Sequence, residues 1–553
     1  MDSSSTLTRL LLFLERVSAN PGIIKAVYSI AVLFFLSIVI APAVAGIIAQ
    51  MLSLSSLELN GVVLTRMERA VSWSFIIGLV VSTLDVLAGI PLAWVIVRKR
   101  GRWTTILDSL ADIPFVVPTV ALGFSILEFW SSPLGIAQLF GYSLVTPGSA
   151  LIMLLHFAFS FPVIVRVMVG EFLNYRETYE VAARTLGAST FTAVRTVTFP
   201  ILRPGILAAF LLALARSLSE TGATIVVAGA FENGTVFISN ARSAGLTSAV
   251  VVASLILIVT SLVVFALIKI IAPRIRITPL RVWPKFERKL GRAPVVAARD
   301  AASITIFLVF VLFPCLFIAL PAILAVASGT GTEAIAGTGP WGAFWSSMLL
   351  SYTIAVVATV LNIISGLPMA ILIARNRYGT RITRIVDVLV DLPIIVPSLA
   401  LGVSLNFFWR NMGSLPEFWV IVLAHMTITY SYFVRAMTAS IQEVQPELED
   451  AAKTLGARPL RVFRRITLPL TKYALLSGAI LVFTRSVDET GATSAVSKTL
   501  KTAPILLVSW IKGTVPVTPA ERALGVGFLV VTSFLALVVL RLVAIRQPSR
   551  KVT

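Results

Sequence analysis

The segment Asp112-Ile-Pro-Phe-Val-Val-Pro-Thr-Val-Ala-Leu-Gly123 is repeated later in the chain as Asp391-Leu-Pro-Ile-Ile-Val-Pro-Ser-Leu-Ala-Leu-Gly402. Each copy is almost entirely apolar and carries two prolines at the same places. Further matches follow in the same order along the chain: Glu180–Gly187 with Glu449–Gly456, Arg216–Thr224 with Arg485–Thr493, His156 with His425, and Arg166 with Arg435. An ordered set of matches indicates a duplicated unit rather than chance similarity.

The composition identifies the environment of this duplicated unit. The chain has 553 residues, of which 57% are hydrophobic and only 13% are charged, and its net charge is +20. A soluble protein carries about 25% charged residues, and a disordered chain has low hydrophobicity. Both classes are therefore excluded, and the long charge-free runs predict helices that cross a membrane.

The sequence predicts an all-α polytopic membrane protein with about 12 transmembrane helices in two parallel six-helix repeats. Six spans per half is an even number, so both halves enter the membrane in the same orientation. We expect a first half at 1–272, a basic cytoplasmic linker at 273–301 and a second half at 302–553. The expected spans are 24–51, 70–97, 108–130, 147–170, 205–229, 245–272, 302–328, 345–374, 386–409, 416–437, 473–496 and 524–545.

The basic residues predict the orientation and the partners of the chain. They gather in short loops such as 98–102 and 375–384, and in the linker, where Arg274, Arg276, Arg281, Lys285, Arg288, Lys289, Arg292 and Arg299 lie. This bias places both termini in the cytoplasm of a cell whose plasma membrane holds the protein. The lipid bilayer, and not nucleic acid, is therefore the expected partner of the positive charge.

The residue types and motifs that catalysis, metal binding or nucleotide binding require are scarce in this chain. The chain has two histidines and one cysteine, Cys315, which lies in an apolar run, and it has no Gly-Lys dipeptide and so no P-loop. We therefore expect no catalytic residue, no metal site and no cofactor on this chain.

Two long polar loops, 171–204 and 440–472, interrupt the apolar pattern at matching places. Each contains a Glu, two alanines, a basic residue and Leu-Gly, and each has a proline thirteen residues after that glycine, at Pro200 and Pro469. The spacing predicts a slim helix that ends at a left-handed glycine and a second helix that begins afresh at the proline. A surface hairpin that merely connects two spans is the simpler interpretation, but its duplication in both halves argues against it.

This pattern resembles the "EAA" loop of the type I importer permeases of the ATP-binding cassette (ABC) superfamily. The chain looks like two such subunits fused head to tail, as in iron(III) and thiamine permeases. The resemblance implies that each loop docks as a coupling helix on a cytoplasmic dimer of ATPases, which would bind the ATP and Mg²⁺, and that an extracellular or periplasmic binding protein delivers the solute. The motif positions are Glu180, Ala183, Gly187, Glu449, Ala452 and Gly456.

Ionisable residues and prolines inside the spans are candidates for the pathway or a gate. Arg216 with Glu220, and Arg485 with Glu489, are four residues apart, so each pair either neutralises itself within one helix or places polar groups at the pathway. Thr221-Gly222 and Thr490-Gly491 permit close packing or local unwinding. The prolines that break the third and ninth spans are Pro114, Pro118, Pro393 and Pro397. Asp85 matches Asn362 and is expected to hold helices together.

The solute remains open between an oxyanion such as molybdate, tungstate or sulfate, iron(III), and thiamine. The stretch Arg216–Thr224 resembles a segment of molybdate and sulfate permeases, whereas the fused arrangement resembles the other two groups. The alternative function is an ion-coupled secondary transporter with two parallel repeats, which would need a buried unpaired carboxylate and no cytoplasmic partner.

Overall fold

The computed structural model describes residues 13, 15–53, 60–99, 101–271, 274, 283–413 and 415–545. All regular structure within these residues is helical. In this part of the chain, ten helices are long and apolar enough to cross a membrane, and two further bent helix pairs raise the number to twelve if each pair is one span. The predicted all-α membrane fold is confirmed.

The first half forms a series of helices from residue 61 to residue 271. They are α4 (Gly61–Arg98), α5 (Arg102–Leu110), α6 (Ile113–Val116), α7 (Thr119–Ser131), α8 (Ala137–Phe140), α9 (Ser149–Asn174), α10 (Thr178–Thr185), α11 (Thr190–Ala193), η2 (Val194–Thr198), α12 (Phe199–Ser219), α13 (Gly222–Val227), α14 (Gly234–Ser243) and α15 (Thr247–Ile271).

The second half repeats this series from residue 341 to residue 545. Its helices are α21 (Trp341–Ala374), α22 (Thr380–Val390), α23 (Leu392–Ile395), α24 (Ser398–Asn411), α25 (Glu417–Glu443), α26 (Pro446–Thr454), α27 (Pro459–Val462), η5 (Phe463–Thr467), α28 (Leu468–Val487), α29 (Gly491–Val496), α30 (Ala503–Ile511) and α31 (Pro519–Ile545). Apart from α8, which has no counterpart among the described residues of the second half, the order matches that of the first half, so the sequence repeat is also a structural repeat.

The first span of each half packs on the opposite half. The first span consists of α2 (Pro21–Phe34), η1 (Phe35–Ile40) and α3 (Ala41–Ser53), and it packs on α21 and α24. The seventh span follows α16 (Pro284–Leu290) and consists of α17 (Ala293–Phe307), η4 (Leu308–Leu312), α18 (Phe313–Leu316) and α19 (Ala319–Ala327). In this span α17 packs on α4 and α18 on α7, while α19 and the following α20 (Thr330–Ala336) contact α31.

We call the first and the seventh span the exchanged spans, because each packs on the opposite half. Matching serines bind them. Ser125 on α7 donates to the carbonyl of Pro314 at 2.6 Å, and Ser404 on α24 donates to the carbonyl of Pro42 at 2.9 Å. Each serine oxygen also accepts from a backbone N–H of the same span, that of Ile318 at 2.8 Å for Ser125 and that of Ile47 at 3.0 Å for Ser404. One hydroxyl thus satisfies a carbonyl and an N–H group within the membrane. The predicted division at 1–272 and 302–553 follows the repeat in the sequence. In the folded chain, however, the first span of each half packs on the other half.

The predicted breaks in two spans are confirmed, while some predicted span boundaries are wrong. The third and ninth spans are broken, because the chain bends by 107° between Val116 and Thr119, and again by 107° between Ile395 and Ser398. Prolines 118 and 397 occupy these bends, as the sequence predicts. The seventh span begins at Ala293 rather than at residue 302, inside the predicted linker. Arg276 and Arg281 of that linker lie outside the described residues.

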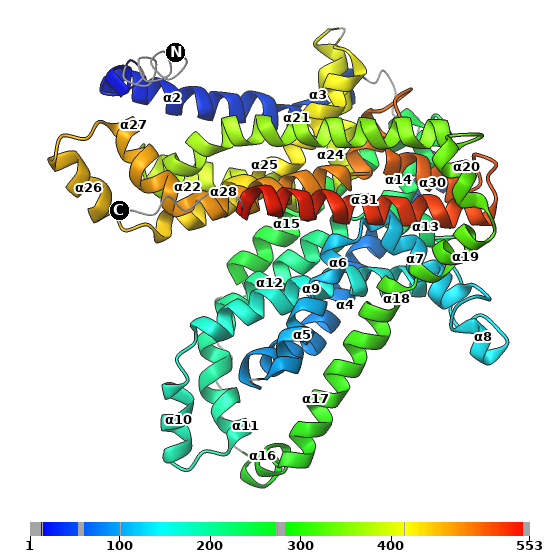
Figure 1. The fold of residues 1–553 in the computed structure, drawn as a ribbon, viewed down its shortest axis with the longest axis horizontal. Coiled ribbons are helices and arrows are strands. Elements are labelled where there is room, and N and C mark those ends of the chain that lie inside the picture. The colour runs from blue at the N-terminus through cyan, green and yellow to red at the C-terminus, as the bar shows by residue number, and fades with distance from the viewer. Residues whose placement is uncertain are drawn as a thin grey trace.

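Figure 1 shows where the loops lie relative to these helices. α10 and α11, and also α26 and α27, lie toward the left of the view, and α8, α20 and α30 lie at the right. The two series of helices meet around α13 and diverge toward the left (Figure 1). The two polar loops therefore lie at the same end of the membrane helices, although they are apart from one another.

Candidate translocation pathway and coupling loops

The first polar loop is fixed to a membrane helix of its own half. Glu180 on α10 is buried and accepts a hydrogen bond from Nη2 of Arg98 at 3.0 Å. Arg98 is the last residue of α4, and its Nη1 also pairs with Glu177 at 2.7 Å. Hydrogen bonds between charged groups are stronger than neutral ones, so α10 is held firmly at the end of α4.

The second loop repeats this contact. Glu449 on α26 is buried and accepts from Nη2 of Arg375, the residue that follows α21, at 2.8 Å. Thr467 donates to the same carboxylate at 3.0 Å. Both motif glutamates therefore stabilise the loop from inside, and neither presents its carboxylate on the surface.

The exposed tip of each loop is a leucine that the sequence analysis did not single out. Leu186 is 89% exposed and Leu455 is 88% exposed. Each precedes a glycine with positive φ, at +92° for Gly187 and +82° for Gly456, as the sequence predicts. A signal for these leucines was present, because each stands beside the glycine of a duplicated motif. Ala183 and Ala452 are half-buried on the same short helices.

The predicted fresh helix start at Pro200 and Pro469 is wrong. The π-helical segments η2 and η5 connect α11 to α12 and α27 to α28, so that Thr190–Ser219 and Pro459–Val487 are continuous spans. The wider π-helical turn accommodates a proline that lacks an N–H group. Each polar loop is consequently continuous with a membrane helix.

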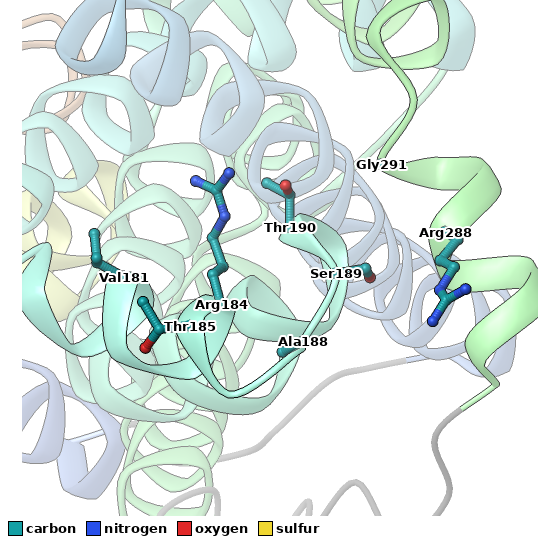
Figure 2. A pocket seen from close by; sticks show the side chains of 8 residues that line it. All are labelled: Val181, Arg184, Thr185, Ala188, Ser189, Thr190, Arg288 and Gly291. Atoms are coloured by element: carbon teal, nitrogen blue, oxygen red, sulfur yellow. The ribbon is translucent and has the colours of Figure 1, made fainter.

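An open pocket of about 610 Å³ lies beside the first loop (Figure 2). Its walls come from the α10–α11 segment and from α16. Figure 2 shows that Arg184 and Arg288 on these walls do not direct their guanidinium groups toward each other. The pocket is therefore not built to enclose an anion, and it is part of the surface that surrounds the loop.

Four of the predicted pathway residues, Arg216, Glu220, Arg485 and Glu489, lie in or just before the breaks in two membrane helices. α12 ends at Ser219 and α13 begins at Gly222; α28 ends at Val487 and α29 begins at Gly491. Glu220 accepts a hydrogen bond from the backbone N–H of Ala223 at 3.0 Å, and Glu489 accepts from Ala492 at 3.0 Å. Each glutamate therefore caps the short helix that follows the break.

The two breaks touch each other between the halves. A Cβ atom built on Gly222 would lie 2.2 Å from Oγ1 of Thr490, and one on Gly491 would lie 2.9 Å from Oγ1 of Thr221. Neither glycine has room for a side chain. The sequence analysis considered two roles for these Thr-Gly pairs, close packing and local unwinding. The structure displays both of them.

A cavity of about 390 Å³ lies between the halves next to these breaks. It is lined by α6 and α12 from the first half and by α28 and α31 from the second. The predicted residues Pro118, Arg216 and Arg485 line it, and so does Asp488, which the sequence analysis did not name. Pro114, Pro393, Pro397, Glu220 and Glu489 are not among its lining residues.

The two arginines of the cavity differ in their surroundings. Arg485 pairs with Glu489 at 3.1 Å and approaches Asp488 at 3.8 Å. The expected pair of Arg216 with Glu220 is not among the ion pairs within 4.0 Å in the described part of the chain, since the helix ends between them and Glu220 turns to cap α13. Arg216 instead stacks on the ring of Phe159 at 3.8 Å and donates to its carbonyl at 3.2 Å. Arg216 therefore lines the cavity without a direct ion pair in the described residues, although Asp112 and Asp488 line the same cavity.

Asp488 also connects the two halves. Its Oδ1 accepts a hydrogen bond at 2.5 Å from the backbone N–H of Thr119, the first residue of α7. At the matching place, where the second half contacts the first, no carboxylate takes part. There the hydroxyl of Ser398 at the start of α24 donates to the carbonyl of Ser219 at 3.0 Å. Comparison of the repeats could have indicated Asp488, since a serine occupies its place in the first half.

The chain matches one family model twice. The model describes the inner membrane component of binding-protein-dependent transport systems, and it matches residues 85–277 and 366–552. The chain belongs to this family. It is the membrane-spanning permease component of an ABC importer, with two family domains fused in tandem. Members of this family work with an ABC ATPase and a solute-binding protein.

Individual permeases align with about a third of the chain each. The molybdenum transport permease ModB of Mycobacterium tuberculosis is 32% identical over 181 residues, which cover 29% of this chain and 68% of that protein. The sulfate transport permease CysT of Salmonella typhimurium is 31% identical over 202 residues, covering 33% and 70%. The molybdate/tungstate permease WtpB of Methanocaldococcus jannaschii is 30% identical over 213 residues, covering 37% and 82%.

One buried carboxyl group of the permease lies away from this cavity. Asp85 on α4 is fully buried and accepts from the hydroxyl of Ser160. At the matching position Asn362 donates to the hydroxyl of Thr429 at 2.8 Å. The two contacts join the same pair of helices in each half, which agrees with the predicted role of holding helices together.

Proposed function

We propose that this permease carries a tetrahedral oxyanion of the molybdate, tungstate and sulfate class across the plasma membrane. The observation that carries the proposal is Arg216, a cation that lines the cavity between the halves and is not among the ion pairs within 4.0 Å in the described residues. An arginine in such a place can donate several hydrogen bonds to an oxyanion. The names of the aligned permeases support the same solute class.

Transport is driven from the cytoplasmic side by a separate pair of ABC ATPases, which bind the ATP and Mg²⁺. The two coupling loops offer them matching exposed tips, Leu186 and Leu455. Basic residues near these loops, among them Arg98, Arg375, Arg377 and Arg381, support a cytoplasmic position for this end and for both termini. A binding protein delivers the solute at the opposite end.

The test is reconstitution of the permease in liposomes with its ATPase and its binding protein. We expect ATP-dependent accumulation of radiolabelled molybdate, tungstate or sulfate, and a rise in the Tm of the binding protein with the same anion. Accumulation of iron(III) or thiamine instead would refute the solute class. Uptake by the permease alone, with only an ion gradient, would refute the coupling to an ATPase and favour the secondary transporter.

A further inference from the structure

The segments that precede the two exchanged spans carry the observation. Glu287 lies on α16, six residues before α17 begins at Ala293. Glu15 lies in the helical turn at residues 15–17, six residues before α2 begins at Pro21. The two glutamates therefore occupy the same place relative to the two exchanged spans, although the sequence analysis did not pair them.

Glu287 binds the first coupling loop. Its carboxylate accepts hydrogen bonds from the hydroxyl of Thr192 at 2.5 Å and from Nη2 of Arg195 at 2.6 Å, and its side chain is only 5% exposed. Thr192 belongs to α11, and Arg195 belongs to the π-helical segment that joins α11 to the membrane span. Glu287 thus holds the point at which the loop continues into the membrane.

Glu15 binds the second coupling loop at the equivalent point. Its carboxylate accepts from Nη2 of Arg461 at 2.7 Å and lies 3.6 Å from Nη1 of Arg464, and its side chain is 8% exposed. Arg464 matches Arg195 of the first half. The backbone N–H of Leu460 also donates to the hydroxyl of Ser18 at 3.3 Å. The contact therefore recurs in both halves with different side chains.

Both carboxylates are charged at neutral pH. The hydroxyl of Thr192, together with Arg195, lowers the pKa of Glu287 below its usual value, and the guanidinium of Arg461 does the same for the pKa of Glu15. Each exchanged span is also fastened nearby, by the ion pair of Lys99 with Asp300 at 2.6 Å and by the hydrogen bond of Ser29 with Tyr378 at 2.6 Å. Hydrogen bonds between two charged groups are stronger than neutral ones, so each contact holds the coupling loop and the segment before the exchanged span together.

We propose that Glu15 and Glu287 are positioning residues. Each glutamate ties an exchanged span to the coupling loop of the opposite half, which is the half on which that span packs. The N-terminal glutamate controls the loop of the second half, and the linker glutamate controls the loop of the first half. Each loop and its exchanged span then move as one unit when the ATPases close. This inference rests on the proposed coupling role of the loops.

Limited trypsin digestion of the full-length permease in nanodiscs tests the crossed pattern without any partner. Trypsin cleaves after Arg184 in α10 and after Lys453 in α26. We expect Glu287→Gln to accelerate cleavage after Arg184 about tenfold and to leave cleavage after Lys453 unchanged, with the reverse for Glu15→Gln, because each change removes one charge-assisted contact. Glu333→Gln, an exposed acid on α20, is the matched control. Equal effects on both loops, or no effect on either, would overturn the proposal.

Transport per ATP hydrolysed provides a readout that loss of stability alone would not change. In proteoliposomes with the ATPase and the binding protein, we expect Glu287→Gln to keep ATP hydrolysis and to lower the oxyanion transported per ATP several-fold. The double variant Glu287→Arg with Arg195→Glu, in which the two charges are swapped, should restore this ratio to within twofold. Absence of ATP-driven uptake by the unmodified permease would refute the proposed function. An unchanged ratio in Glu287→Gln, with normal uptake by the unmodified protein, would refute only the positioning role.

Discussion

Arg216 and Arg485 occupy matching positions in the repeat and yet have different electrostatic environments. Arg485 is neutralised by Glu489, whereas Arg216 rests on the ring of Phe159. A buried ion pair that loses one partner leaves an uncompensated charge, which costs about 3–5 kcal/mol. The same substitution should therefore affect transport at one position and stability at the other.

Arg216→Gln is expected to leave the folded permease intact and to reduce oxyanion uptake at least tenfold, since a charged hydrogen bond contributes about 1.5–3 kcal/mol to binding. Arg485→Gln is expected to lower the Tm in detergent, and the added change Glu489→Gln should restore it. Uptake measurements and thermal unfolding on the same preparations check both results. Normal uptake by Arg216→Gln would show that the cation does not meet the solute.

The glycines at the loop tips are required by their backbone conformation. Gly187 and Gly456 have positive φ, and no atom lies within 4 Å of a Cβ built on either. A valine there would strain the backbone by about 1–2 kcal/mol without any internal clash. We expect Gly187→Val to preserve insertion of the permease and to reduce ATP-dependent uptake. Gly245→Val, at an exposed loop glycine with φ of +73°, is the control and should transport normally.

Asp85 distinguishes the importer from an ion-coupled carrier. Its counterpart Asn362 makes an equivalent hydrogen bond with an amide, which cannot take up or release a proton. We therefore expect Asp85→Asn to retain most of the ATP-dependent uptake at every pH between 6 and 8. Loss of uptake in this variant, in a permease of normal Tm, would instead indicate that the carboxyl group takes part in ion coupling.

At the scale of elements, α7 begins at a contact between the halves. The first N–H groups of a helix have no partner inside the helix, and Asp488 of the opposite half accepts the one from Thr119. The positive end of the helix dipole favours this carboxylate. In the second half the contact at the start of α24 is different, because the hydroxyl of Ser398 donates to the carbonyl of Ser219 and no backbone N–H of α24 takes part in that bond.

Asp488→Ala should lower the free energy of unfolding by about 1–2 kcal/mol, the usual effect of removing a helix cap. Ser219→Ala changes the matching residue in the first half but leaves its backbone carbonyl in place, and it should be nearly neutral. Thermal unfolding of both variants in detergent measures the difference. Equal destabilisation would mean that the carboxylate does not stabilise the contact.

Local sequence predicted most elements because apolar length and proline position act locally. The bends at Pro118 and Pro397 followed from the prolines. The π-helical joints before Pro200 and Pro469 did not, since the sequence does not specify whether a proline ends a helix or is accommodated by a wider turn. The breaks at Thr221-Gly222 and Thr490-Gly491 depend on each other, because each glycine makes room for the opposite threonine.

At the scale of the whole molecule, the exchange of the first spans makes each half depend on the other. The serine contacts to Pro314 and Pro42 join segments almost 200 and more than 350 residues apart in the sequence. We therefore expect the halves to stay associated without the linker, because packing and hydrogen bonds in the membrane also join them.

Expression of residues 1–277 and 278–553 as two separate chains should yield a complex that co-purifies and transports when the ATPase and the binding protein are added. Removal of residues 1–57 from the first chain should weaken that complex, because the first span packs on the second half. Co-purification through a tag on one chain measures the association. Failure of the two intact chains to associate would contradict the importance of the exchanged spans.

The amino-acid sequence by itself determined the membrane fold, the duplication, the family and the places of the two polar loops, because these follow from hydrophobic length and from short motifs. Only the tertiary structure decided which residues meet. It buried Glu180 and Glu449 against Arg98 and Arg375, separated Arg216 from Glu220, and brought Asp488 to α7. These contacts join residues that are far apart in the sequence, and a sequence pattern does not show which distant residues lie close together in space.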